Sequence, residues 1–425
     1  MNPLTPWAPA AKRRGLSKEH IFLLAVLGAA SFFDGYDVSV KTLALTHIRE
    51  TFDLTKAAAS AVLAIIYLGA LPAMIITRWA DRVGRRRLLV WSVFGYITFS
   101  ALTAVAPNTF TFTGFQFLQQ VFVVAESAIV WTMAAEELPA DSRGFGFGVL
   151  AMNAALGTGV AAMLWSVLEP AGASWRWLYV ASLPPLLFVG YLRRRLPESR
   201  RFLEAQEKGT LAERWQAIFA PGVRQWLMLI VVTTALIQLG QWAVNFTIDF
   251  LETERHLSTA TANLMLIGAG LPGIPIMIAA GALSDRFGRK QVGCAFGLAA
   301  IVGAVGFFWL PGGVPVLLPC MSLTIIGQLG SYPVLQTFTS ELFPTAVRSS
   351  ASAWANIASV VGRSMSLGLG ALLLLQVSPS ATATILGIGP LVAIIIIALR
   401  FPDTHGRELE DITGEDLAIA ASAIP

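Results

Sequence analysis

The stretch Thr77-Arg-Trp-Ala-Asp81-Arg82-Val-Gly84-Arg85-Arg86-Arg87 is a short basic hairpin between two apolar runs, residues 57–76 and 88–106. A similar stretch, Gly281-Ala-Leu-Ser-Asp285-Arg286-Phe-Gly288-Arg289-Lys290, again stands between two apolar runs. Asp81 and Asp285 are 204 residues apart. A repeat of this size in an apolar chain is typical of transporters that are built by internal duplication.

A second signature repeats at almost the same spacing. Glu136-Glu-Leu-Pro139-Ala-Asp-Ser-Arg143 returns as Glu341-Leu-Phe-Pro344-Thr-Ala-Val-Arg348, and both end residues are displaced by 205 positions. Two unrelated loops that recur at one spacing indicate a unit of roughly 205 residues that is present twice.

The composition is that of a membrane protein. Of the 425 residues, 55% are hydrophobic and 13% are charged, whereas a soluble domain carries about a quarter charged residues. The net charge is only +4, and the basic residues stand in short clusters between apolar runs, so nucleic-acid binding is not indicated. The two cysteines and four histidines form no metal motif. The sequence predicts a non-enzymatic protein of the lipid bilayer, without a cofactor or metal.

A helix needs about 20 apolar residues to cross the hydrocarbon of a bilayer. On this scale the sequence predicts an all-α membrane protein with twelve transmembrane helices in two six-helix bundles. The predicted spans are 21–45, 57–77, 88–106, 110–135, 144–168 and 176–196, then 225–251, 259–283, 291–310, 314–339, 349–375 and 381–400. The predicted parts are an N-terminal tail (1–20), a first bundle (21–196), a linker (197–223), a second bundle (224–400) and a C-terminal tail (401–425).

The distribution of basic residues predicts the orientation. With both termini inside, the cytoplasmic segments hold 24 of the 30 lysines and arginines. The external segments hold four, namely Arg49, Lys56, Arg176 and Arg255. Because cytoplasmic loops carry the excess of positive charge, we expect a multi-pass protein of the plasma membrane (the inner membrane of a bacterial cell) with both termini in the cytoplasm.

The repeated loops carry a resemblance to a known family. The paired Asp-Arg-x-Gly-Arg-Arg/Lys loops resemble the hallmark of the major facilitator superfamily. The paired Glu-x-x-Pro-x-x-x-Arg loops resemble its sugar-porter branch, as do Pro197-Glu198-Ser199 and Pro402-Asp403-Thr404. The resemblance implies two six-helix bundles around a central site, transport by alternating access, and a monomer.

The chain departs from the family pattern at three places. Thr77 stands where the first hairpin usually begins with glycine, and Gln116 stands where span four often has arginine. The run Phe33-Asp34-Gly35-Tyr36-Asp37 in span one looks more like the proton symporters of aromatic acids and other metabolites.

The repeated loops are also predicted to form a cytoplasmic gate. Acidic and basic side chains of the two signatures are expected to pair as charged latches that release when the bundles rock; the alternative is that the arginines only set topology. The predicted gate residues are Asp81, Arg82, Gly84, Arg85, Glu136, Arg143, Asp285, Arg286, Gly288, Arg289, Glu341 and Arg348.

Carboxylates inside the spans are candidates for proton coupling. Asp34, Asp37 and Lys41 share one face of span one, and Glu126 lies deep in span four. A desolvated carboxylate takes up a proton more readily than one in water, so we predict Asp34, with Asp37 and Glu126, as proton sites. The alternatives are a structural Asp37–Lys41 ion pair with Asp34 hydrogen-bonded to another helix, and a structural hydrogen bond at Glu126.

A cation inside span eleven suggests an anionic substrate. Arg363 has Asn356 two turns before it on the same face, and the arginine fork suits carboxylate recognition. The resemblance adds that organic-anion carriers of related families place a basic residue in this span. The alternative is that Arg363 only pairs with a carboxylate such as Asp34 or Glu126.

Two polar stripes are predicted to line the cavity, because polar side chains have no use against lipid. The alternative for any single member is a hydrogen bond between helices. The stripes consist of Gln238, Gln241, Trp242, Asn245 and Asp249 in span seven and of Gln328, Tyr332 and Gln336 in span ten.

Together these patterns favour proton-coupled symport of a small organic anion, an aromatic or aliphatic carboxylate. The expected partners are the substrate, protons and the bilayer. A sugar or polyol carrier and a drug or organic-cation exporter remain as alternatives. A membrane sensor or enzyme is not favoured, because the chain has no long cytosolic domain and no Ser/His or metal cluster.

Overall fold

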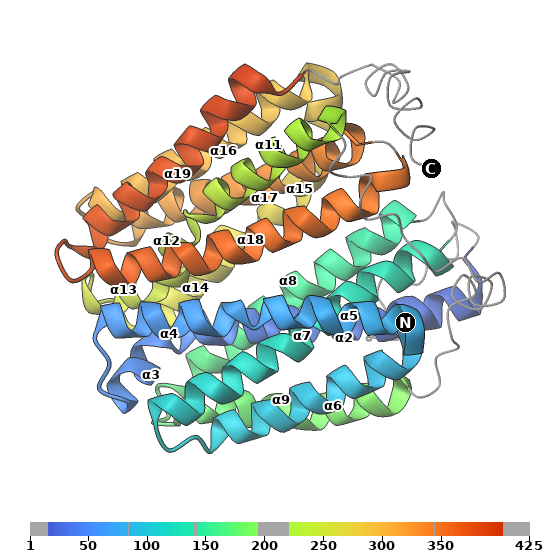
Figure 1. The fold of residues 1–425 in the computed structure, drawn as a ribbon. Coiled ribbons are helices and arrows are strands. Elements are labelled where there is room, and N and C mark those ends of the chain that lie inside the picture. Colours follow the sequence, from blue (N-terminus) through green and yellow to red (C-terminus); the bar gives the residue numbers. More distant parts are fainter. Residues whose placement is uncertain (1–15, 84, 139–142, 194–220, 344, 403–425) are drawn as a thin grey trace. The chain divides into compact units, whose positions relative to one another are not determined.

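The computed structural model of the chain describes residues 16–83, 85–138, 143–193, 221–343 and 345–402 (Figure 1). Within these ranges all regular secondary structure is α-helical, as the sequence predicts. The predicted linker 197–223 and both predicted tails lie mostly outside the described residues.

The first six predicted spans correspond to eight helices, because spans one and two are each interrupted. Ala44 separates the two helices of span one, and Gly69 separates those of span two. The helices are α2 (Lys18–Leu43), α3 (Leu45–Thr51), α4 (Lys56–Leu68), α5 (Ala70–Val83), α6 (Arg85–Ala104), α7 (Thr109–Glu137), α8 (Arg143–Leu168) and α9 (Arg176–Arg193).

In the second half, spans seven and eight are the interrupted ones. Span seven consists of three helices and span eight of two. The helices are α11 (Pro221–Gln238), α12 (Gln241–Asn245), α13 (Thr247–Thr253), α14 (Thr259–Gly270), α15 (Gly273–Phe287), α16 (Arg289–Trp309), α17 (Val314–Glu341), α18 (Thr345–Leu373) and α19 (Pro379–Arg400).

Among the described residues, nine helical segments are long and apolar enough to cross a membrane. The three predicted spans outside this set are those formed by α7, by α9 and by α14 with α15. Leu271 and Pro272 interrupt span eight and divide it into helices of 12 and 15 residues. Large apolar side chains such as Ile75, Met163 and Leu399 are more than 60% exposed, which suits a surface that faces lipid.

The chain forms two compact units. The first consists of residues 1–54, 65–212 and 258–263, and the second of residues 55–64, 213–257 and 264–425. In the first unit, α2, α6, α7 and α8 bury a core that includes Leu27, Leu89, Val130 and Leu150. In the second, α11, α17 and α19 bury a core that includes Ile230, Phe338, Phe343 and Ile397.

Polar residues mark where several helices begin. Ser17 Oγ accepts a hydrogen bond from His20 N at 3.2 Å, and His20 Nδ1 accepts one from Ser17 N in return. Asn108 and Ser378 accept from the third residue beyond them in the same way. These side chains satisfy amide groups that have no partner within the helix.

The basic hairpins are tighter than the sequence suggests. The second hairpin is a single-residue turn, because α15 ends at Phe287 and α16 begins at Arg289. The residue between them, Gly288, has φ +93°, a conformation that side-chain-bearing residues rarely adopt. In the first hairpin α5 reaches Val83 and α6 starts at Arg85, so most of the signature is helical.

Helices α2 and α8 pack backbone against backbone. A Cβ atom added at Gly35 would lie 1.9 Å from the Ala154 carbonyl oxygen, and one at Gly157 would lie 1.9 Å from the Phe32 carbonyl oxygen. Small residues permit such close approach of membrane helices. This crossing places the polar residues of α2 at a fixed depth in the first unit.

Candidate functional site

A buried ion pair lies near the C-terminal end of α2. Lys41 Nζ lies 2.5 Å from Asp37 Oδ2, and both side chains are 2% exposed. The two residues are one helical turn apart, so the helix itself brings the charges together. The structure therefore contains the ion pair that the sequence offered as an alternative to a proton site, and both functions remain open to Asp37.

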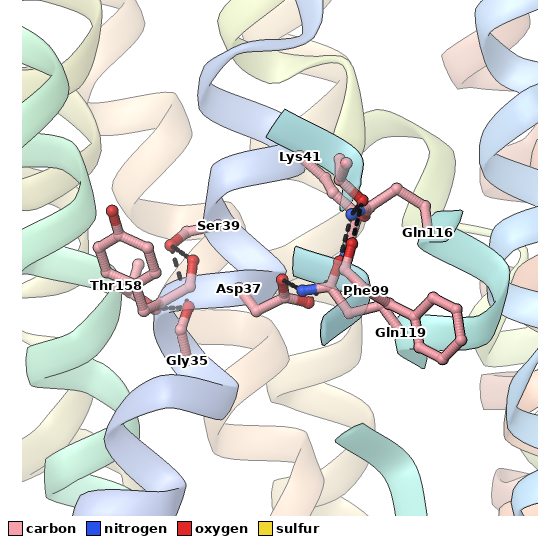
Figure 2. Close-up of polar contacts among 10 residues, drawn as sticks. Gly35, Asp37, Ser39, Lys41, Phe99, Gln116, Gln119 and Thr158 are labelled. Atoms are coloured by element: carbon pink, nitrogen blue, oxygen red, sulfur yellow. Dashed lines mark hydrogen bonds and ion pairs between the residues drawn. The ribbon is translucent and has the colours of Figure 1, made fainter. Parts of the chain in front are cut away.

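Helix α7 supplies the second partner of Asp37. Gln119 Nε2 donates to Asp37 Oδ1 at 2.6 Å. Gln116 Nε2 donates to Gln119 Oε1 and, at 3.0 Å, to Thr103 Oγ1 of α6. In Figure 2 the side chains of Lys41, Gln116 and Gln119 gather on one side of Asp37. Both oxygens of the carboxylate thus accept a hydrogen bond, and a polar chain links α2, α7 and α6.

The opposite side of α2 is fixed by a separate set of hydrogen bonds. Thr158 Oγ1 of α8 donates to the Gly35 carbonyl oxygen at 3.1 Å, and Ser39 Oγ donates to the same oxygen at 2.9 Å (Figure 2). Tyr36 OH donates to the Leu178 carbonyl oxygen of α9 at 2.7 Å. These contacts hold the helix against α8 and α9 while Asp37 faces α7.

The other two acidic candidates lie in the same region of the first unit. Asp34 is half-buried, one turn before Asp37, and Glu126 on α7 is 1% exposed. The charges of Asp34, Asp37 and Glu126 all act on the buried hydroxyl of Tyr96 in α6. The fold therefore brings the three predicted proton sites within electrostatic range of one side chain.

In the second unit, span seven is interrupted next to the predicted polar stripe. Leu239 and Gly240 separate α11 from α12, and their amides bond to the carbonyl oxygens of Leu236 and Ile237 in α11. Ser366 of α18, which is fully buried, donates from Oγ to the Leu239 carbonyl oxygen at 2.5 Å and accepts from Trp242 N at 3.1 Å. One hydroxyl thus bridges the break.

Polar side chains of the span-seven stripe form hydrogen bonds with other residues of the chain. Gln238 Nε2 donates to Ser359 Oγ at 2.6 Å, and Gln241 Nε2 lies 3.5 Å from Gln328 Oε1. Asn245 donates to the Gln241 carbonyl oxygen, and Trp242 is fully buried with its ring stacked on Phe246. The side chains of Tyr332 and Gln336 lie outside the description.

On α18, Arg363 and Asn356 lie at the edge of the face that packs on span seven. The packed face carries Ser366 and Gly362, where a Cβ would lie 2.5 Å from the Ala235 carbonyl oxygen. Arg363 is half-buried, and Asn356 is exposed. Their common face agrees with the helical spacing read from the sequence.

The predicted gate is described only in part. Arg286 is exposed with its guanidinium 5.3 Å from the ring centre of Phe287, Gly288 forms the turn, and Arg289 is half-buried. Gly84 lies outside the described residues. So do the side chains of Asp81, Arg82, Arg85, Glu136, Arg143, Asp285, Glu341 and Arg348.

Two features escaped the sequence analysis. One is Ser366, since a single serine in an apolar helix gives no signal of its own. The other is Lys56, whose Nζ lies 2.5 Å from Glu254 and 3.8 Å from the buried Asp249, within the second unit. Here the signal was a lone lysine at the start of a span, but its partners are almost 200 residues away.

The sequence profile of the Major Facilitator Superfamily matches this chain over residues 27–366 and 230–423. The chain belongs to the major facilitator superfamily. The crystal structure of a D-xylose-proton symporter has the same fold, with a TM-score of 0.74 and 22% identity over 91% of this chain and 99% of that one.

Curated relatives of this superfamily member are transporters. The probable 4-methylmuconolactone transporter of Cupriavidus pinatubonensis is 24% identical over 90% of each chain. The cis,cis-muconate transport protein of Acinetobacter baylyi is 28% identical over 78% of this chain and 81% of its own length. The protein is accordingly a major facilitator superfamily transporter and a multi-pass membrane protein.

Replacing Ser366 with alanine is expected to destabilise this transporter by about 1–3 kcal/mol, because the Leu239 carbonyl and Trp242 amide would lose their buried partner. Thermal unfolding in detergent would measure the change. Ser166→Ala is the matched control, since its hydroxyl bonds only within its own helix, to the Met163 carbonyl oxygen. Equal stability of the two variants would contradict the bridging role of Ser366.

Proposed function

We propose that this transporter carries out proton-coupled symport of a small organic anion, an aromatic or aliphatic carboxylate, by alternating access. The observation that carries the proposal is the acidic cluster of Asp34, Asp37 and Glu126 within the spans of the first unit. Ionisable groups at membrane depth are costly and typically mark ion or proton pathways. The cluster supplies the proton sites.

The anionic substrate class is supported by Arg363 and by the relatives. A half-buried arginine in a membrane span, with Asn356 on its face, suits a substrate that brings a carboxylate. One relative is named for cis,cis-muconate, which is a carboxylate. In the proposal Arg363 holds the substrate carboxylate, with help from Asn356, Gln238, Gln241, Trp242, Asn245, Tyr332 and Gln336.

We also propose the orientation of the transporter in the membrane. The excess of basic residues in alternate loops supports cytoplasmic termini in a plasma membrane. The repeated loop signatures, which include Asp81, Arg143, Asp285 and Arg348, form the cytoplasmic gate. The protein works as a monomer.

A thermal-shift screen of the purified protein tests the substrate class. The panel contains benzoate, cis,cis-muconate, short aliphatic carboxylates, sugars and quaternary ammonium compounds. A ligand at about 100 times its Kd stabilises a protein by about 2.7 kcal/mol. We expect carboxylates to stabilise wild type, and we expect Arg363→Ala to lose at least about tenfold in affinity, because hydrogen bonds to charged groups contribute about 1.5–3 kcal/mol.

Arg363→Lys is the matched control, since it retains the charge and should keep part of the carboxylate affinity. Stabilisation by sugars or quaternary ammonium compounds, unchanged in Arg363→Ala, would contradict the proposal and return Arg363 to a structural role. Uptake into proteoliposomes then tests coupling: an acidic exterior should drive accumulation of the stabilising carboxylate, and no response to the pH gradient would exclude symport with protons.

A further inference from the structure

Asp37 and Lys41 form a buried ion pair whose net charge is zero. Among the described residues, Lys41 is the one cation within ion-pair distance of Asp37, and Asp37 is the one carboxylate within that distance of Lys41. Both side chains are 2% exposed. Removing one charge from such a pair leaves the other uncompensated in a low-dielectric region, which is strongly unfavourable.

This neutrality restricts what the pair can accept. If Asp37 takes up a proton alone, Lys41 is left as an unpaired buried cation. If a carboxylate arrives alone, the pair and the anion together carry an excess negative charge. Only the arrival of both returns the summed charge of the pair, the proton and the anion to zero. The electrostatics thus favour two states, one with neither proton nor anion and one with both.

The hydrogen bonds of Asp37 suit such an exchange. Lys41 contacts Oδ2, whereas Gln119 donates to Oδ1. A proton can therefore replace Lys41 at Oδ2 while Gln119 keeps its bond to Oδ1. In that step an O–H bond forms on Asp37, the ion pair with Lys41 breaks, and the lysine keeps its own proton.

Lysine is also the appropriate cation for this task. Its ammonium group is a compact charge with three donors on a flexible four-carbon stem, so Nζ can turn from one carboxylate to another. The network has unused hydrogen-bonding capacity as well. Gln116 Oε1, Gln120 Oε1 and Tyr96 OH are buried and have no partner within the described part of the chain.

The other titratable groups whose charges interact around Asp37, in the described part of the first unit, are tyrosines and carboxylates. They are Tyr36 and Asp34 on α2, Tyr96 on α6, Glu126 on α7 and Tyr179 on α9, where the charge of Asp37 reaches the tyrosine hydroxyls. Tyrosines are uncharged near neutral pH. The cation that a carboxylate would meet beside these groups is Lys41, and its charge is held by Asp37.

We propose that Lys41 is a cation shared between Asp37 and the carboxylate of the substrate. It pairs with Asp37 while that group is ionised, and it binds the substrate carboxylate once Asp37 has taken up a proton. This inference rests on the proposed anion symport and deepens it, because it assigns the residue that couples binding of the proton to binding of the anion. It makes the transport of a monocarboxylate electroneutral, with one proton for each anion.

The test compares how carboxylate affinity depends on pH in wild type and in Asp37→Asn. The probe is whichever carboxylate of the panel above stabilises wild type most, measured in detergent between about pH 6 and pH 8. Once Asp37 is ionised, wild-type affinity should fall about tenfold for each pH unit, because binding must also take up a proton. In Asp37→Asn, Lys41 is permanently available, so affinity should stay nearly constant and exceed that of wild type at the alkaline end.

Four further variants sharpen the result. Lys41→Gln should lose carboxylate binding at every pH, and Lys41→Arg should retain it. The double variant Asp37→Asn/Lys41→Gln leaves no unpaired charge, so it should fold and bind no carboxylate even if a single variant does not fold. Glu254→Gln removes one acidic partner of a different lysine, Lys56, and should keep the wild-type dependence on pH.

Contrary results distinguish a wrong shared-cation inference from a wrong assignment of anion symport. If wild type binds a carboxylate but Asp37→Asn keeps the wild-type dependence on pH, or the double variant still binds, the shared-cation inference is wrong and anion symport stands. If no carboxylate of the panel binds wild type, both are wrong. Uptake of a monocarboxylate that follows an imposed membrane potential at constant pH would also overturn the inference.

Discussion

Replacing Lys41 with methionine should destabilise the protein by about 3–5 kcal/mol, because the substitution leaves the carboxylate of Asp37 buried without its cation. Gln119 would remain as a hydrogen-bond donor to Oδ1, but an amide does not neutralise a charge. The midpoint of thermal unfolding in detergent, measured near neutral pH, would report the loss. This prediction concerns stability and does not depend on any substrate.

The double variant Lys41→Met/Asp37→Leu should recover most of that loss. Replacing both members of a buried ion pair with apolar side chains of similar size is often neutral or stabilising. The difference between the single and double variants measures the coupling of the two residues. If Lys41→Met alone were as stable as wild type, the ion pair would not be a buried charge pair in the folded protein.

Replacing Gly157 with alanine should also have a large effect, a destabilisation of about 3 kcal/mol or more. The new Cβ would lie 1.9 Å from the Phe32 carbonyl oxygen, and backbone cannot turn aside as a flexible side chain can. Overpacking a well-filled core costs about 1–3 kcal/mol, and here two helices must separate. Thermal unfolding and the yield of monodisperse protein after size-exclusion chromatography would show the effect.

Gly159→Ala is the matched control, because it lies on the same helix two residues away and a Cβ there meets nothing within 4 Å. Alanine favours helix over glycine by about 1 kcal/mol, so this variant should be as stable as wild type or slightly more stable. Equal losses in the two variants would show that α8 does not approach α2 as closely as the structure indicates.

Much of the fold could be predicted because membrane spans leave a strong signal. Apolar runs of suitable length, separated by basic clusters, predicted the helices, and the repeated signatures predicted the duplication. Their ends were less predictable. The first basic signature was read as a hairpin, whereas most of it continues the helices on either side of residue 84, since helical backbone tolerates basic residues where a span leaves the hydrocarbon.

The candidate site was predictable only within single helices. The Asp37–Lys41 pair follows from a spacing of four residues. In contrast, the sequence offered Trp242 and Asn245 as cavity residues because they share a face with Gln241. In the structure Trp242 stacks on Phe246, and Asn245 bonds to the Gln241 carbonyl oxygen. Periodicity shows that side chains share a face, but it does not show what covers that face.

By itself, the sequence determined that this chain crosses a membrane many times, in two related halves, with three acidic side chains inside the spans of the first half. These properties depend on composition, periodicity and repetition, which are local or regular along the chain. The tertiary structure alone decided that Gln119, 82 residues from Asp37, completes the carboxylate's hydrogen bonds. It also decided that Ser366 bridges a break in span seven that lies 127 residues away. Such partners depend on which helices meet and at what depth, and close packing of particular side chains and backbone sets both.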